Sequence, residues 1–397
     1  MTAAVPFGAL CACLLAGRLT HRFGRRPVLM GAAVLFALGA LAAALTQAVW
    51  MLVLARMDLG LAIGAAAIVA PLYISESAPE RIRGALVATY QLAITLGILG
   101  AYLTGLALNG PGMWRWMFAL GTVPALLFLA GLFFLPESPR WLMLAGREGE
   151  ARASLIWLHG KRADIEPELA AIRAAAANGA GAGGLGEVFR AASVRPVLIV
   201  AMGLFFLQQL SGINAVIYCA PQIFSAAGFA DAQTAILATV GIGMVNFLTT
   251  FAGMWLVDGW GRRPLLVTGF VGTSICLTLI AASVLLPGGL PHWLVLAALF
   301  GYIAAFAMSL GPLPHIMMSE VFPLRLRGAG MGAASLSNWG FNVVVVFSFP
   351  LLLRHLGLGG VFLLFAVMCA AGVVFTLARV PETKGLSLEA IQNKLGT

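Results

Sequence analysis

The chain has 397 residues, of which 61% are hydrophobic and only 10% are charged, and its mean hydropathy is +0.97. Soluble globular domains contain about a quarter charged residues, so the composition excludes a soluble domain and requires a lipid environment. The net charge of +9 comes without a basic stripe interleaved with aromatic residues, which excludes nucleic-acid binding and indicates contact with anionic lipid headgroups.

Apolar runs long enough to cross a hydrocarbon core of about 30 Å as helices recur along the whole chain. The first run lacks a basic leader and continues into a charged loop, so it is interpreted as a span and not as a cleaved signal. The sequence predicts an all-α membrane protein with eleven spans, at residues 2–17, 28–47, 51–74, 84–107, 116–135, 195–218, 234–257, 265–286, 293–318, 329–353 and 359–379.

The loops between these spans alternate in charge. Every Lys and Arg except Arg56, Arg115 and Arg354 lies in one alternate set of loops, in the segment 140–195 or after residue 378. By the positive-inside rule this set is cytoplasmic. The pattern predicts a multi-pass protein of the cell (inner or plasma) membrane, with the 140–194 linker and the C-terminus in the cytoplasm.

Three landmarks recur at a nearly constant offset of about 240 residues, which indicates two homologous halves. The pairs are Gly24-Arg25-Arg26-Pro27 with Gly261-Arg262-Arg263-Pro264, Glu76 and Arg83 with Glu320 and Arg327, and Pro136-Glu137 with Pro381-Glu382. The predicted domains are an N-terminal bundle (1–139), a cytoplasmic linker (140–194), a C-terminal bundle (195–380) and a tail (381–397).

Within the linker, stretches 147–158 and 163–176 are amphipathic and are predicted to be helices, followed by a glycine-rich run at 181–186. The second half also has a span, 195–218, whose counterpart in the first half falls before Met1. The repeat therefore predicts five helices in the first bundle and six in the second, with a further helix upstream in a longer form of the protein. A start assigned too late and a truncated variant are both compatible with this pattern.

Few ionisable side chains lie well inside the spans, and only Arg56, Asp58 and His315 do so. Such groups are costly in lipid and are usually functional. The five histidines have no metal-ligand spacing, no nucleophile and base are paired, and the cysteines lie in apolar spans as packing residues without disulfides. No enzyme activity, metal or cofactor is expected.

Uncharged hydrogen-bonding side chains are instead abundant inside the spans. Amides donate and accept hydrogen bonds, and aromatic rings offer flat apolar faces, which together suit a neutral sugar. A lone amide such as Asn246 or Asn342 has an alternative role as an interhelical hydrogen bond, whereas the adjacent pair Gln208 and Gln209 favours substrate contact. The candidates are Gln91, Gln208, Gln209, Asn214, Tyr218, Asn246, Asn338, Trp339 and Asn342.

Two helices are predicted to break near these side chains. Ser211-Gly212 separates Gln208 and Gln209 from Asn214, and Gly311-Pro312-Leu313-Pro314 interrupts the span at 293–318. Transporters place their binding sites at such broken helices near the membrane midplane.

The segment Gln208-Gln209-Leu210-Ser211-Gly212-Ile213-Asn214 resembles the signature of the sugar porter family of the major facilitator superfamily. This family includes facilitative glucose carriers and bacterial proton-linked xylose, arabinose and galactose symporters. The markers Pro136-Glu137-Ser138-Pro139-Arg140-Trp141-Leu142 and Pro381-Glu382-Thr383-Lys384-Gly385 resemble the same family, and the similarity covers essentially the whole chain.

The resemblance implies a major facilitator fold of two pseudo-symmetric helical bundles and sugar contacts at Gln91, Gln208, Gln209, Asn214, Asn246, Asn338 and Trp339. It also implies a cytoplasmic gate of ion pairs between arginines and glutamates of both halves. An equal alternative for the arginines is that they only keep these loops on the cytoplasmic side, but this alternative does not explain the repeated glutamates. The gate residues are Arg25, Arg26, Glu76, Arg83, Glu137, Arg140, Arg262, Arg263, Glu320, Arg327 and Glu382.

Two features depart from the family pattern. His315 stands where the family commonly has a Trp, so it is a candidate for sugar contact or proton transfer, with a solvated pore residue as the alternative. Arg56 resembles an arginine that pairs with an Asp of the first helix in proton-linked members, and this helix is absent here. Asp58 is a weak substitute because side chains at i and i+2 do not face each other.

These observations predict a monosaccharide transporter that works by alternating access, as a functional monomer, with proton symport in the full-length form. Its partners are a small neutral sugar, protons and membrane lipids. The alternatives are a facilitative carrier of a polyol or other small neutral solute, a non-transporting sugar sensor, and an inactive truncated chain.

Overall fold

The computed structural model describes residues 3–78, 83–160, 165–177, 185–191, 194–217, 232–286, 289–322 and 326–384. These residues divide into two compact units. Unit 1 comprises residues 1–90, 110–195 and 322–339, and unit 2 comprises residues 91–109, 196–321 and 340–397. The predicted boundaries at 139, 194 and 380 stay predictions.

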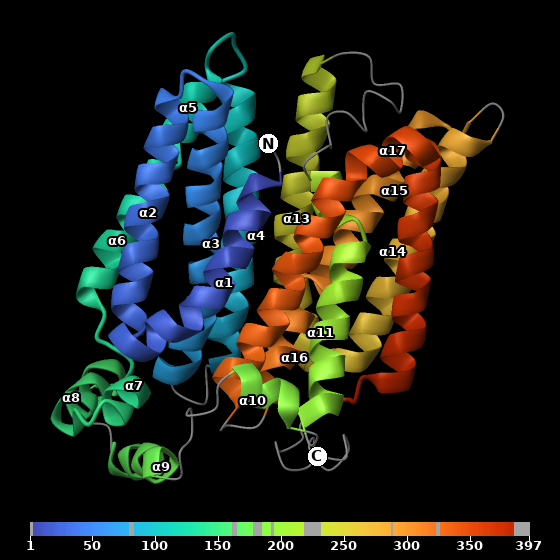
Figure 1. Cartoon of the computed structure of the whole chain (residues 1–397). Coiled ribbons are helices and arrows are strands. Elements are labelled where there is room, and N and C mark those ends of the chain that lie inside the picture. The colour runs from blue at the N-terminus through green and yellow to red at the C-terminus, as the bar shows by residue number, and fades with distance from the viewer. Residues whose placement is uncertain are drawn as a thin grey trace. The chain divides into compact units, whose positions relative to one another are not determined.

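The described part of the chain is helical throughout (Figure 1). The first helices are α1 (Ala4–Phe23), α2 (Arg25–Leu45), α3 (Val49–Ser77), α4 (Arg83–Ala107), α5 (Trp114–Leu120) and α6 (Thr122–Phe134). The middle helices are α7 (Pro139–Leu144), α8 (Glu148–His159), α9 (Glu166–Ala177) and α10 (Leu185–Arg190). The remaining elements are α11 (Arg195–Leu210), α13 (Ala232–Trp260), α14 (Arg262–Leu285), α15 (His292–Ala305), the π-helix η2 (Phe306–Leu310), α16 (Leu313–Val321) and α17 (Arg327–Arg379).

Ten helical stretches of the described residues are long and apolar enough to cross a membrane. The last stretch, 329–379, contains Gly357 with a non-helical backbone (φ 67°, ψ 174°), so α17 is two helices joined at a kink. It therefore accounts for both spans predicted at 329–353 and 359–379. The span predicted at 116–135 is divided at Gly121 into α5 and α6.

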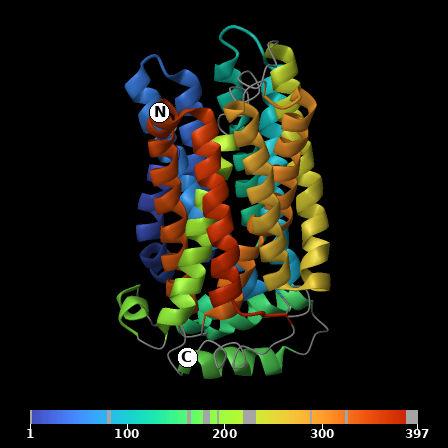
Figure 2. The same cartoon turned by 90° about the vertical axis from the view of Figure 1, so that its right-hand side faces the viewer.

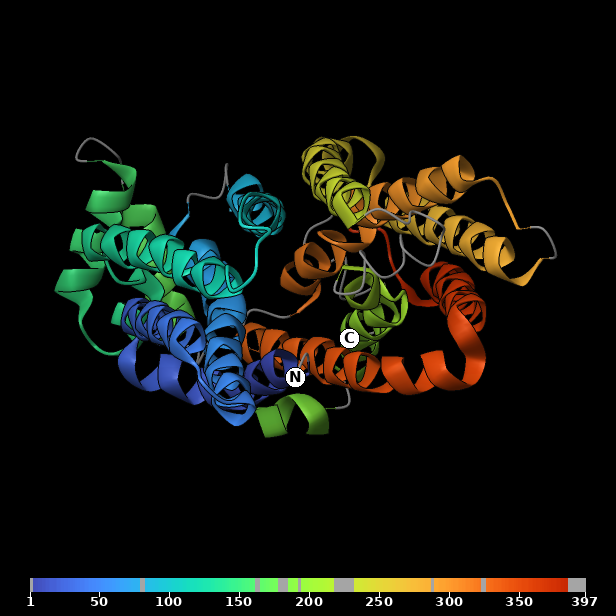
Figure 3. The ribbon, with the colours of Figure 1, turned by 90° about the horizontal axis from the view of Figure 1, so that it is seen from above.

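The helices α1 and α3 of unit 1 pack with their backbones in close contact, and Figure 3 shows α1, α2 and α3 next to one another from above. Glycines make this approach possible. A Cβ added at Gly60 or Gly64 of α3 would collide with backbone atoms of α1, and one added at Gly8 would collide with Met57 O. Small residues at helix contacts let membrane helices associate through van der Waals packing, because lipid provides no hydrophobic driving force between them.

The core of unit 2 forms around α11, which is the most buried of the candidate spans. Leu204 and Leu207 of α11 pack with Leu266 and Phe270 of α14 and with Phe365 of α17 in one apolar cluster. The helices α13, α14 and α15 pack with roughly parallel axes (Figures 1 and 2), and consecutive helices run in opposite directions. This packing fixes the position of the polar end of α11.

The two amphipathic stretches predicted in the linker are helices, α8 and α9, and this prediction is confirmed. Leu155 of α8 and Leu169 and Ile172 of α9 are buried in a small core with Leu142 and Met143 of α7. Ion pairs link the exposed side chains of Arg152 with Glu166, Arg173 with Glu148 and, near the start of α8, Arg147 with Glu150. Nε2 of His159 lies 3.3 Å from Oε2 of Glu168. The linker helices therefore form a folded substructure of unit 1.

Candidate functional site

The break predicted at Ser211-Gly212 is present in unit 2. The helix α11 ends at Leu210, and Gly212 adopts a φ of +82°, a backbone conformation that residues other than glycine rarely adopt. Residues 213–217 are helical again. The break brings Asn214 back toward the end of α11, where its Nδ2 donates to Oε1 of Gln209 at 2.6 Å.

The second break follows from the two prolines of Gly311-Pro312-Leu313-Pro314. A helix would pair the carbonyl of Leu310 with the N–H of residue 314, but Pro314 has no N–H. The amide Nε2 of Gln208 takes that place, because it donates to Leu310 O at 2.6 Å and lies 3.4 Å from Gly311 O. One side chain of α11 is thus committed to holding the broken helix, a role that the sequence did not predict.

His315 and Gln91 lie at the same break. The ring nitrogen Nδ1 of His315 is 3.3 Å from Gly311 O, and its ring meets the edge of Phe205, with centroids 4.9 Å apart. A Cβ added at Gly311 would lie 3.5 Å from Nε2 of Gln91. Unit 2 therefore gathers Gln91, Gln208 and His315 around the backbone of Gly311.

Two buried amide oxygens in unit 2 have no hydrogen-bond donor among the residues that the structure describes. These are Oε1 of Gln208, whose residue is 4% exposed, and Oδ1 of Asn342, whose residue is 5% exposed. A buried acceptor without a donor costs about 1–3 kcal/mol. The arrangement is therefore suited to a ligand that donates hydrogen bonds, such as a hydroxyl compound.

The other predicted sugar contacts are not all brought to this cluster. Asn246 is buried on α13, and an interhelical hydrogen bond stays the alternative to sugar contact. Asn338 and Trp339 belong to unit 1, and Trp339 packs beside the buried cluster that contains Cys13 and Tyr73. Tyr218 lies outside the described residues.

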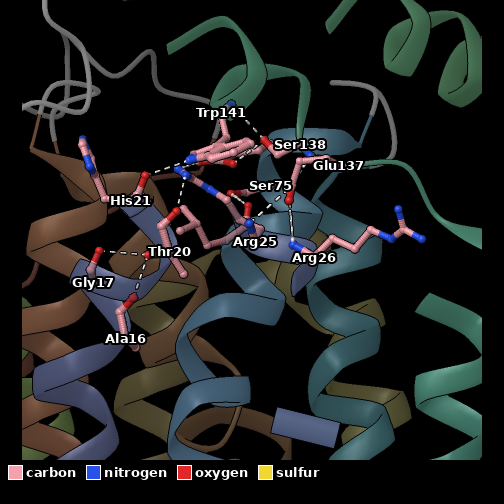
Figure 4. A network of polar contacts seen from close by, with 12 residues as sticks. Ala16, Gly17, Thr20, His21, Arg25, Arg26, Ser75, Glu137, Ser138 and Trp141 are labelled. Carbon is pink, nitrogen blue, oxygen red and sulfur yellow. Dashed lines mark hydrogen bonds and ion pairs between the residues drawn. The ribbon is translucent and has the colours of Figure 1, made fainter. Parts of the chain in front are cut away.

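The repeated Gly-Arg-Arg-Pro segments form two similar turns, turn 1 (24–27) in unit 1 and turn 2 (261–264) in unit 2. In turn 1, the Glu137 carboxylate accepts hydrogen bonds from the backbone N–H groups of Arg25 and Arg26 at 3.1 Å each (Figure 4). In turn 2, Glu382 accepts from the backbone N–H groups of Arg262 and Arg263 at 3.0 Å each. Each carboxylate thus caps the N-terminus of the helix that follows the turn, α2 after turn 1 and α14 after turn 2.

The arginine side chains of the turns bind carbonyls at the C-terminal ends of other helices. In turn 1, Nη1 of Arg25 donates to Thr20 O at 3.3 Å and Nε of Arg26 donates to Leu132 O at 2.9 Å. In turn 2, Arg262 donates to Val257 O at 3.3 Å and Arg263 to Leu377 O at 2.5 Å. Guanidinium groups therefore donate to carbonyls in the last turns of these helices, including Thr20 O, which also accepts from the backbone N–H of Gly24.

In unit 1, the described residues next to turn 1 also form a buried network of side chains. Oε1 of Glu76 forms an ion pair with Nη2 of Arg25 at 2.8 Å, and Oε2 accepts from the hydroxyl of Ser138 at 2.5 Å. Ser138 also caps α7, and Pro139 follows it at the first helical position, which is a recognisable N-cap signal. Sequence reasoning missed Ser138 although this signal was available.

The predicted gate between the two halves stays a prediction. Glu137 and Glu382 contact the turn of their own unit, and Arg25 with Glu76 is an ion pair within unit 1. Arg140 lies in the first turn of α7. The side chains of Arg83, Glu320 and Arg327 lie outside the described part of the structure.

The two capping carboxylates lie beyond the ends of the spans and differ in acidity. Burial raises the pKa of Glu137, and this effect outweighs the hydrogen bonds from the backbone of Ser138, Arg25 and Arg26. Burial acts in the same direction on Glu382, but hydrogen bonds from four backbone N–H groups outweigh it and lower the pKa overall. Glu382 receives two of these bonds from Thr383 and Lys384, which follow it directly.

Arg56 and Asp58 are both half-buried on α3. The pairing of Arg56 with an Asp of an upstream helix stays a prediction. Among the described residues there is no group of three His, Cys, Asp or Glu side chains arranged to hold a metal ion.

Comparison with known proteins agrees with the geometry. The family described as "Sugar (and other) transporter" matches residues 1–395. The galactose-proton symporter of Escherichia coli (strain K12) is 38% identical over 402 residues, covering 100% of this chain and 85% of the relative. The D-xylose transporter of Levilactobacillus brevis is 38% identical over 401 residues, covering 100% of this chain and 86% of the relative.

The fold is also that of a solved transporter. The proton:xylose symporter XylE of the major facilitator superfamily, bound to 6-bromo-6-deoxy-D-glucose, superposes with a TM-score of 0.85 at 32% identity. The match covers 99% of this chain and 88% of XylE. The predicted major facilitator fold is thereby confirmed.

Proposed function

Because the chain belongs to the sugar transporter family of the major facilitator superfamily, we propose that it moves a monosaccharide across the cell membrane by alternating access, together with a proton. Its relatives form a family of multi-pass membrane transporters and not of enzymes. The substrate is a hexose or a pentose.

The observation that carries this proposal is the pair of buried acceptors, Gln208 Oε1 and Asn342 Oδ1, that lack donors among the described residues. A sugar hydroxyl donates one hydrogen bond and accepts others, so it satisfies such an oxygen without bringing charge into the membrane. Gln91, Gln209 and Asn214 add further neutral donors and acceptors within unit 2. A neutral polyhydroxylated ligand is the best match for this set.

Coupling to a proton is inferred from the relatives. The galactose-proton and arabinose-proton symporters of Escherichia coli are 38% and 36% identical to this chain. Coupling to a proton lets the membrane potential drive accumulation, at about 2.3 kcal/mol per charge and 100 mV.

A labelled-sugar uptake assay in proteoliposomes tests the proposal. We expect uptake of at least one of D-galactose, D-xylose, L-arabinose and D-glucose, stimulated by an inward proton gradient. Gln208→Ala should weaken sugar affinity about 3- to 10-fold, because a neutral hydrogen bond contributes about 0.5–1.5 kcal/mol.

The control is Thr278→Val, which removes an exposed hydroxyl that donates to Ser274 O of its own helix. It should leave uptake unchanged. Uptake of a polyol with no monosaccharide uptake would contradict the proposal, and so would equal loss of uptake in both variants.

A further inference from the structure

Asp58 is an acidic side chain placed inside a membrane span. It lies on α3 about 14 Å along the helix axis from Val49, at 1.5 Å per residue, and is half-buried. The positive-inside pattern places the start of α3 on the outer side. An ionised carboxylate at this depth is costly, so a functional reason for it is expected.

The helix α2 leaves a notch for this carboxylate. A Cβ added at Gly39 would lie 2.8 Å from Oδ2 of Asp58 and 3.1 Å from Cγ of Leu59. The carboxylate therefore rests against the backbone of α2 in space that only glycine leaves open. The Asp58 side chain therefore points toward α2 of the same unit.

The elements packed on α3 bring few charges to Asp58. In the sequence, α1 from Ala4 to Gly17 and α2 from Val28 to Leu45 contain no Asp, Glu, Lys, Arg or His. Arg56 lies two positions earlier on α3 itself, and α7 meets α3 near Glu76, at the far end of the helix.

Beyond these elements, Arg115 binds the carbonyl of Ala44 with Nη1 at 3.0 Å, near the end of α2. Asp58 itself makes no hydrogen bond or ion pair with the residues that the structure describes. No contact there offsets the cost of its negative charge. Binding a proton converts the carboxylate to the neutral acid and removes that cost.

We propose that Asp58 is a proton-binding site of the transport cycle. It takes up one proton from the outer side when sugar is bound and releases it on the inner side, so that one proton and one sugar cross together. This inference rests on the proposed proton-linked sugar transport and assigns a residue to the proton.

The experiment compares the wild type with Asp58→Asn and Asp58→Glu in proteoliposomes that carry an inside-negative potential. One charge moved through 100 mV corresponds to about a 50-fold accumulation of sugar. We expect Asp58→Asn to reduce accumulation to about 1-fold while retaining sugar counterflow, and Asp58→Glu to restore accumulation. Full accumulation by Asp58→Asn would overturn the inference, and so would loss of counterflow as well, because the residue would then serve binding or folding.

A second pair of variants tests the notch. Gly39→Ala should displace the carboxylate and shift the pH midpoint of counterflow, whereas Gly31→Ala on the same helix, with nothing within 4 Å of the added Cβ, should not. An unshifted midpoint in Gly39→Ala would contradict the proposed position of the proton site. A wild type that carries no monosaccharide would instead contradict the proposed function, whatever Asp58 does.

Discussion

Turn 1 and turn 2 are two copies of one motif that share a backbone cap and differ in the pKa of the capping glutamate. Both place a glycine with φ near +95°, at +97° and +93°, before a helix whose first N–H groups bind a glutamate more than 100 residues later. They differ in what surrounds the glutamate. Glu137 accepts from the next N–H group, that of Ser138, and lies next to the ion pair of Arg25 with Glu76. Glu382 accepts from the next two N–H groups, those of Thr383 and Lys384. The backbone cap is therefore common to both units, whereas the pKa is raised for Glu137 and lowered for Glu382.

Alanine at the glycine of each turn should give the largest effect. A Cβ on Gly24 would collide with Oε2 of Glu137, and one on Gly261 would lie 2.8 Å from Oε2 of Glu382. We expect Gly24→Ala to lower the free energy of unfolding by about 3 kcal/mol, because backbone strain adds to the collision. Gly261→Ala should lower it by about 1–3 kcal/mol through backbone strain. Thermal unfolding in detergent measures both, with Gly31→Ala as a neutral control. Equal midpoints for Gly24→Ala and wild type would refute the shared cap.

Replacing each glutamate by glutamine should give a smaller effect and should sharpen the contrast. Hydrogen bonds to a charged group contribute about 1.5–3 kcal/mol and those to a neutral group about 0.5–1.5 kcal/mol. The charge of Glu382 is favoured by its surroundings, as its lowered pKa indicates, whereas that of Glu137 is disfavoured. Glu382→Gln should therefore destabilise its turn more than Glu137→Gln, as read from amide hydrogen exchange at residues 262–263 and 25–26. A larger destabilisation by Glu137→Gln than by Glu382→Gln would contradict the electrostatic difference between the turns.

Acidification should give the smallest effect, with opposite signs in the two units. The pKa of folded Glu382 lies below its usual 4.5, so its stabilising contribution is present above 4.5 and is lost as the pH falls through the folded value. The pKa of folded Glu137 lies above 4.5, so the folded state takes up a proton first and turn 1 gains stability as the pH falls toward 4.5. Hydrogen exchange compared between about pH 6 and pH 4, corrected for intrinsic rates, should show protection rising at turn 1 and falling at turn 2. A parallel change in both turns would contradict this assignment.

The sequence predicted those features that depend on neighbouring residues. The helix breaks at Ser211-Gly212 and Gly311-Pro312, and the two linker helices, follow from local backbone chemistry and from apolar periodicity. The repeat likewise marked both Gly-Arg-Arg-Pro segments as equivalent positions in the two halves. Each of these predictions needed only short segments of chain.

The remaining features depend on where distant segments meet. The role of Glu137 and Glu382 in a gate stays a prediction, and the structure adds backbone N–H partners within their own units that the sequence did not predict. Gln208 was predicted to contact substrate, and half of its amide is used by the Leu310 carbonyl. Such hydrogen-bond partners follow from the packing of whole helices, which residue spacing does not specify.

The separation between each turn and its cap also has a consequence for biosynthesis. Arg25 is bonded to a residue 112 positions later and Arg262 to one 120 positions later. At about 5–20 residues per second, the ribosome needs on the order of ten seconds to deliver the capping glutamate after each turn has emerged. During that interval the first N–H groups of α2 and of α14 depend on water or lipid headgroups, so each half closes only when its last helix has been inserted.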